Sequence, residues 1–170
     1  KQIKEEYNID AHQVEKVEQF VPKTHFTVCN IAEPQTGLEV KFSMRHIAAM
    51  TLADVDTGSL HSYSDDIASR ADLVELRDKV TIIDKSFNSR MQSEVIVHLK
   101  DKRSLHQFSD AGVPASDLDK QEAKLIRKFN SLLTPIYGEE VSEIVLEKCL
   151  RLDSLESVAE LFDGIVGTNQ

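Results

Sequence analysis

The sequence predicts an α+β fold, with a small antiparallel sheet flanked by helices and amphipathic helices following it at the C-terminal end. Two observations predict this class. Short runs rich in Val and Ile, typical of strands, gather between residues 15 and 108, whereas apolar residues after residue 119 recur every three or four positions. We therefore expect residues 1–118 to form an α+β domain and residues 119–170 to form C-terminal helices.

The strands are predicted from alternation and from short β-branched runs. Residues 15–21 and residues 80–84 form two such runs. In residues 94–99 apolar and polar side chains alternate, so Val95, Val97 and Leu99 share one face. A second extended run follows at residues 103–108 after a short charged turn, which indicates a β-hairpin.

The first helices are predicted from residues that cap helix N-termini. Ser43 precedes a helix over residues 44–54, and Ser64 or Asp65 precedes a helix that reaches residue 79 with a break near Ala71.

The C-terminal helices are predicted from caps and from apolar spacing. Asp117 or Asp119 begins a helix that reaches about residue 133, and Pro135 and Gly138 interrupt it. Two further helices are expected over residues 139–152 and 154–163. Their apolar residues exceed what a small sheet can cover, so we expect the isolated chain to associate through this region.

The composition excludes several classes of function. The chain of 170 residues has 20 Lys and Arg against 29 Asp and Glu, a net charge of −9. We predict no nucleic-acid partner, because binding phosphates requires a basic face, and no membrane partner, because the longest apolar run (residues 47–53) is too short to span a bilayer. Cys29 and Cys149 are isolated, which predicts buried thiols in a reducing compartment and a cytoplasmic protein.

Most motifs that carry chemistry are absent from the sequence. Its glycines form no phosphate-binding loop, and no nucleophile elbow is present. Its histidines form no closely spaced pair, so we predict no metal site.

One segment combines cationic side chains with the start of a helix. Lys41 and Arg45 flank the predicted cap Ser43, and His46 lies one turn into the helix. Together with the helix N-terminus they favour binding of a carboxylate, with His46 as an acid or a base. We expect Lys41, Arg45 and His46 to face one concave surface. The alternative interpretation is that these are the solvent-exposed ends of an apolar helix.

At these residues the sequence resembles a known family. Residues 39–53, which read Glu-Val-Lys-Phe-Ser-Met-Arg-His-Ile-Ala-Ala-Met-Thr-Leu-Ala, are similar to the Lys-Phe-Ser helix of the MmgE/PrpD family. This family includes 2-methylcitrate dehydratase, cis-aconitate decarboxylase and iminodisuccinate epimerase. Residues 76–80, 94–101 and 124–129 resemble later family segments in the same order, and the resemblance covers about residues 10 to 165.

The resemblance implies the C-terminal lid region of a lyase or isomerase that acts on a di- or tricarboxylic acid by proton abstraction next to a carboxylate. It implies no metal and no organic cofactor. Lys41, Ser43 and Arg45 would bind the substrate, and His46 would be the catalytic residue. In the decarboxylase branch a Tyr takes the position of His46, so the reaction branch stays open.

The resemblance also implies partners for this chain. Family members carry most of their catalytic set in an N-terminal helical domain, including a Lys…His motif that this sequence lacks. We therefore expect the chain to be incomplete and inactive alone, to pack on that domain and to form a homodimer. The alternative is a stand-alone α+β binding or protein-interaction module without catalysis, whose C-terminal helices dock on a partner chain.

Overall fold

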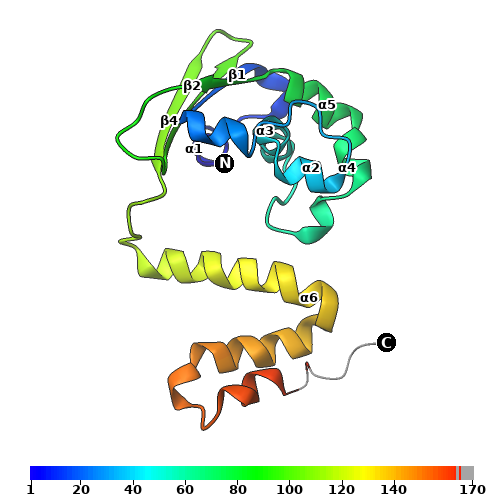
Figure 1. Cartoon of the computed structure of the whole chain (residues 1–170), viewed down its shortest axis with the longest axis vertical. Helices are drawn as coiled ribbons and strands as arrows, with labels where there is room; N and C mark the ends of the chain where they lie inside the picture. The colour runs from blue at the N-terminus through cyan, green and yellow to red at the C-terminus, as the bar shows by residue number, and fades with distance from the viewer. Residues whose placement is uncertain (164, 166–170) are drawn as a thin grey trace. The chain divides into compact units, whose positions relative to one another are not determined.

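The computed structural model describes residues 1–163 and 165, and the chain divides into two compact units (Figure 1). Unit 1 comprises residues Lys1–Thr57 and His61–Pro114. Unit 2 comprises Gly58–Leu60 and the chain from Ala115 on.

Unit 1 is built on a four-stranded sheet with the strand order β2-β1-β3-β4. Strand β1 pairs in parallel with β2 and antiparallel with β3, which in turn pairs antiparallel with β4. The predicted hairpin is confirmed, with His98 opposite Ser104 at its turn. The strands are β1(Val14–Val21), β2(Val80–Asp84), β3(Gln92–Leu99) and β4(Ser104–Asp110).

The α+β class is confirmed, but the prediction of a purely antiparallel sheet is wrong because β1 and β2 run in parallel. Parallel neighbours need a long crossover connection, and here that connection contains helices α2 to α5. Local alternation identifies a hairpin, but it carries no information about which distant strand comes to lie beside β1.

The helices before β2 either precede β1 or lie between β1 and β2. The predicted break near Ala71 is confirmed, since two short helices meet at Arg70, and Ser64 caps the first of them. The α-helices are α1(Gln2–Tyr7), α2(Gly37–Lys41), α3(Met44–Leu52), α4(Asp65–Ser69) and α5(Ala71–Asp78). Short 3₁₀ helices are η1(Ala11–Gln13), η2(Lys23–Thr27) and η3(Leu60–Ser62).

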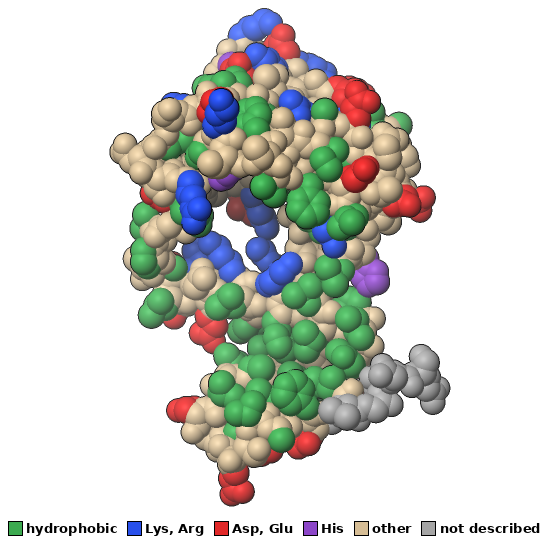
Figure 2. Space-filling model, in the orientation of Figure 1, with side chains coloured by type: hydrophobic (Ala, Val, Ile, Leu, Met, Phe, Trp, Pro, Cys, Tyr) green, Lys and Arg blue, Asp and Glu red, His purple; other side chains and the backbone are tan. Residues whose placement is uncertain are grey.

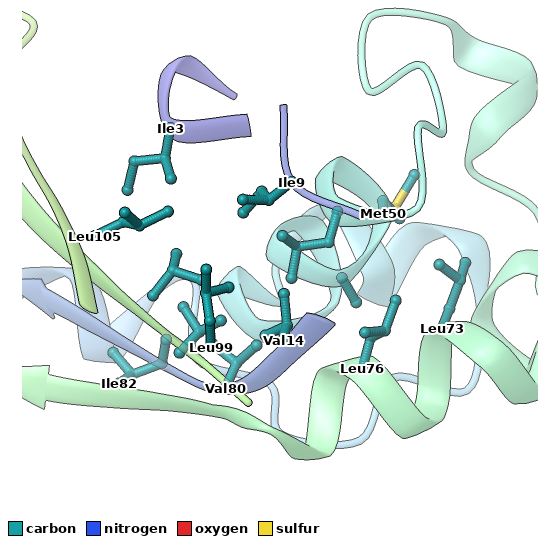
Figure 3. Close-up of a cluster of buried hydrophobic side chains, with 14 of the residues drawn as sticks. Ile3, Ile9, Val14, Met50, Leu73, Leu76, Val80, Ile82, Leu99 and Leu105 are labelled. Atoms are coloured by element: carbon teal, nitrogen blue, oxygen red, sulfur yellow. The ribbon is translucent and has the colours of Figure 1, made fainter. Parts of the chain in front are cut away.

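The hydrophobic core of unit 1 lies between one face of the sheet and these helices (Figure 3). Val80, Val17, Val97 and Leu105 form a buried row across the four strands, because the registers place them opposite one another. Side chains from α1, α3 and α5, such as Ile3, Met50 and Leu73, pack against the sheet or extend the same core.

Unit 2 is formed mainly by helix α6(Leu118–Leu150), followed by η4(Leu152–Ser154) and η5(Val158–Phe162). Asp117 caps α6, as predicted, by accepting a hydrogen bond from the Lys120 amide at 3.0 Å. The predicted interruption falls at Gly138, whose φ of 81° and ψ of 170° are not helical. Few residues other than glycine adopt this conformation.

The prediction of an α-helix over residues 154–163 is wrong. This stretch forms the 3₁₀ turns η4 and η5 instead, and Ser157 caps η5 by accepting a hydrogen bond from the Ala159 amide at 3.2 Å. Its apolar residues have helical spacing, but the cap at Ser157 divides the stretch. Each part is then too short to sustain an α-helix.

Candidate functional site

The segment around Lys41 is held by two consecutive helix caps. Thr36 and Glu39 form a capping box at the start of α2, which ends at Lys41. Ser43 then caps α3, as predicted, and its hydroxyl accepts a hydrogen bond from the His46 amide at 3.2 Å. The chain therefore turns sharply between α2 and α3, and this turn fixes where the side chain of Lys41 emerges.

Helix α2 also packs very closely on the backbone that precedes α4. A Cβ atom added at Gly37 would lie 2.2 Å from the carbonyl oxygen of Tyr63. The Gly37 amide donates a hydrogen bond to Asp65 Oδ1 at 2.8 Å. At the other end of α2, the Lys41 ammonium lies 5.2 Å from the centre of the Tyr63 ring. The Tyr63–Asp65 segment thus contacts both ends of α2, at Gly37 and at Lys41.

Lys41 lines a cavity of about 390 Å³ within unit 1. One wall is the core-facing side of the sheet, and the other walls come from α1 and α3. The α3 residues that line it are Met44, Ile47, Ala48, Thr51 and Leu52. Lys41 itself is exposed to solvent, and its ammonium group lies over the Tyr63 ring.

The sheet wall of this cavity changes from apolar to polar along the strands. Next to the buried row at Val17 and Val97, the following row places Gln19 and Gln107 on either side of Val95. The last row pairs Ser93 with Ser109. These amides and hydroxyls were missed from the sequence, because only the cross-strand register places them on one wall.

Ser43, Arg45 and His46 are not among the residues that line this cavity. Ser43 is buried and serves as the α3 cap. Arg45 Nη1 donates a hydrogen bond to Asn30 Oδ1 at 2.8 Å. Three of the four predicted site residues thus have contacts of their own, and only Lys41 meets the cavity.

The His46 ring is completely buried and joins α3 to α4. Its Nε2 lies 3.0 Å from the carbonyl oxygen of Ile67, so the proton belongs on Nε2, which donates. Within the described residues, Nδ1 has no hydrogen-bond partner. Burial lowers the pKa of this ring below 6.5, the Ile67 carbonyl opposes that effect, and the charges of Arg77 and Arg70 lower the pKa further.

This lowered pKa predicts acid sensitivity. As the pH falls through 6.5, the unfolded chain takes up a proton at His46 that the folded chain accepts only at lower pH, so the free energy of unfolding decreases. His46→Gln retains an N–H donor for the Ile67 carbonyl but cannot titrate. Urea unfolding from pH 7.5 to 5 should therefore show a smaller loss of stability in this variant. The same acid dependence in both proteins would contradict the assignment.

The opposite face of the sheet carries two exposed ionic clusters. In each, a carboxylate lies between a lysine and a histidine: Lys16, Glu18 and His98 form one cluster, and Lys85, Glu94 and His106 form the other. The hydrogen bond from the lysine, and then that from the histidine, hold the pKa of each carboxyl below its ordinary value. The opposite charges within each cluster offset one another on this face of the sheet. The clusters lie on the other side of the sheet from the cavity wall, because neighbouring residues of a strand point to opposite faces.

Metal ligands, membrane spans and thiols are described here for residues 1–163 and 165. In this part of the chain no three His, Cys, Asp or Glu side chains gather in a way that could hold a metal ion. None of its helices is long and apolar enough to cross a bilayer. Both cysteines are free thiols; Cys29 is half-buried at the cavity, whereas Cys149 is exposed, so the expectation that both are buried is wrong for Cys149.

Unit 1 is therefore an α+β domain whose sheet and helices form a mainly apolar cavity that three lysines also line. The family model of the MmgE/PrpD C-terminal domain matches residues 1–152. The chain thus belongs to the MmgE/PrpD family, and the match falls on the C-terminal domain, as the motifs of the sequence suggested. A search of the curated proteins found no match.

Proposed function

We propose that this chain is the C-terminal lid region of a lyase or isomerase that removes a proton next to a carboxylate of a di- or tricarboxylic acid. The observation that carries the proposal is the family match over residues 1–152. After proton removal, the substrate would expel a neighbouring hydroxyl, which takes a proton from an acid and leaves as water, or would regain a proton on its other face. A decarboxylating branch would instead break the carbon–carbon bond to a carboxylate, release carbon dioxide and place a proton from an acid on the carbon left behind. The exposed Lys41 supports the proposal, because a cation beside the substrate stabilises charge that grows during proton abstraction.

The geometry supports different roles for the four predicted residues. Lys41 neutralises a substrate carboxylate from the edge of the cavity. Ser43 caps the N-terminus of α3. Arg45, which is half-buried in the first turn of α3, adds positive charge there. For His46, complete burial and the contact with Ile67 support a positioning role rather than direct contact with substrate.

The proposed partners are a helical domain of the same protein and a second copy of the chain. Unit 2 supports this, because apolar side chains gather on the face of it that Figure 2 shows and its own helices leave several of them exposed. The most exposed of them are Leu118, Leu125, Ile136, Leu150 and Val158. We place the protein in the cytoplasm, in keeping with its two free thiols.

The test of this function is a charge-removing substitution in the protein expressed from its complete reading frame. Lys41→Gln removes the charge and leaves a polar, slightly shorter side chain. Losing a charge-assisted hydrogen bond to the substrate should lower kcat/KM about 10- to 100-fold. The assay measures turnover of 2-methylcitrate, cis-aconitate and iminodisuccinate.

Lys23→Gln is the matched control, because Lys23 is also exposed but does not line the cavity. It should leave kcat/KM unchanged. Equal activity of the Lys41→Gln and unsubstituted proteins would remove Lys41 from the site. No turnover of any di- or tricarboxylate by the folded complete protein would favour a stand-alone binding module.

A further inference from the structure

The unit 1 cavity has an unusual distribution of charge for so acidic a chain. Although the sequence has nine more acidic than basic residues, neither Asp nor Glu is among the residues of the described chain that line the cavity. Lys1, Lys4 and Lys41 all line it, and Lys1 Nζ lies 3.7 Å from Glu5 Oε1. Lys4 is already neutralised by Asp54, at 2.6 Å, and donates to the Leu52 carbonyl.

Lys41 is in a different situation. Within the described residues no carboxylate lies within ion-pair distance of its ammonium group, whose recorded contact is the face of the Tyr63 ring. An exposed cation of this kind, next to a cavity without acidic side chains, favours an anionic group on the ligand.

The remaining walls favour an aliphatic body rather than further charges. Met44, Ile47 and Ala48 of α3 face the cavity, and Val17, Val95 and Val97 line the sheet side. Placing a second or third carboxylate against these side chains would remove it from water without a partner, which is costly. An alkyl chain in the same place gains stability from every methylene that leaves water.

The dimensions and polar groups of the cavity fit a small ligand. Its volume of about 390 Å³ lies in the lower part of the range for small-molecule sites, roughly 300–1,000 Å³. Gln19, Gln107, Ser93 and Ser109 add uncharged hydrogen-bonding groups to an otherwise apolar wall. A few polar groups in a mainly apolar pocket are typical of sites that fix the orientation of one small molecule.

We propose that the unit 1 cavity binds a small monocarboxylic acid with an aliphatic body, with its carboxylate at Lys41 and its alkyl chain between α3 and the sheet. This proposal and the proposed function both use Lys41. The cavity proposal rests on the proposed function for the premise that Lys41 binds a carboxylate. It adds a ligand class that the di- and tricarboxylates of that function do not include.

Calorimetric titration of the protein from the complete reading frame tests this with three probes. Hexanoate has both the carboxylate and the alkyl chain, 1-hexanol lacks the charge, and succinate lacks the alkyl chain. We expect saturable binding of hexanoate, with hexanol and succinate at least about tenfold weaker, since each loses one group that the site recognises. Equal affinities for hexanoate and hexanol, or no saturable binding of hexanoate, would overturn the proposal.

Substitutions locate the binding. Ala48→Phe places a ring into the cavity and should weaken hexanoate at least about tenfold, whereas Ala71→Phe adds the same ring at an exposed position and should not. If Ala48→Phe does not fold, judged by its thermal transition, Ala48→Leu serves in its place with a smaller loss. Unchanged hexanoate affinity in a folded Ala48 variant would overturn the proposal.

The two proposals fail separately. Turnover of a di- or tricarboxylate without hexanoate binding would reject the cavity ligand and leave the proposed function standing. Hexanoate binding that Ala48→Phe abolishes, without turnover of any di- or tricarboxylate, would support the cavity ligand and reject the proposed function.

Discussion

The 170-residue chain, purified by itself, should turn over 2-methylcitrate, cis-aconitate and iminodisuccinate at least about 10²- to 10⁴-fold more slowly than the protein from the complete reading frame. This is the usual effect of removing one principal acid or base. The physical reason is that unit 1 supplies a cation at its cavity, while the one histidine of the predicted site is buried against α4. Proton abstraction needs an accessible base, which we propose lies in a helical domain of the same protein.

The control for this comparison is the fold of the short chain. A cooperative thermal transition shows that unit 1 is intact when activity is measured. Turnover by the short chain within tenfold of the complete protein would contradict the assignment, because residues 1–170 would then carry the base themselves.

Gly37→Ala should destabilise unit 1 by about 3 kcal/mol, the upper part of the usual range for overpacking. The added Cβ would lie 2.2 Å from the Tyr63 carbonyl oxygen and 2.8 Å from Ser64 Cα, and backbone atoms cannot rotate away as a flexible side chain does. Relief requires α2 to move off the Tyr63–Ser64 backbone, which also breaks the Gly37–Asp65 hydrogen bond. Chemical denaturation followed by circular dichroism measures this loss.

Gly112→Ala is the matched control for that substitution. Its Cβ would approach the Asp110 side chain at 3.2 Å and the Met91 side chain at 3.4 Å, and both can adjust. We expect a change of less than about 1 kcal/mol. Equal losses at both glycines would mean that the close approach at Gly37 does not hold α2 in place.

Much of the fold follows from local patterns in the sequence. Alternation in residues 94–99 predicts the β3 face that carries Val97 and Leu99, and both are buried. Short polar residues at 43, at 64 or 65, and at 117 or 119 predict three helix starts, because such a side chain satisfies an otherwise unpaired amide. The structure places the caps at Ser43, Ser64 and Asp117. The parallel pairing of β1 with β2 was not predictable in this way, since it depends on the path of the long connection between them.

The candidate site was predictable only in part. Lys41 stands out as a cation next to a cap, and the structure places it at a cavity. Helical spacing alone does not show that His46 turns toward Ile67, because that contact depends on where α4 packs. Likewise, Gln19 and Gln107 lie far apart in the sequence. They line the same wall of the cavity because both pair with Val95 of the strand between them.

Hydrogen exchange at the substrate tests the central claim most directly, because dehydration and epimerisation both begin with proton abstraction next to a carboxylate. The protein from the complete reading frame is incubated in D₂O with each di- or tricarboxylic acid, and proton NMR follows the C–H groups beside the carboxylates. We predict that one acid loses such a C–H signal, by exchange or by conversion, and that Lys41→Gln slows this loss about 10- to 100-fold. Persistence of every such signal in the presence of folded protein would contradict the account.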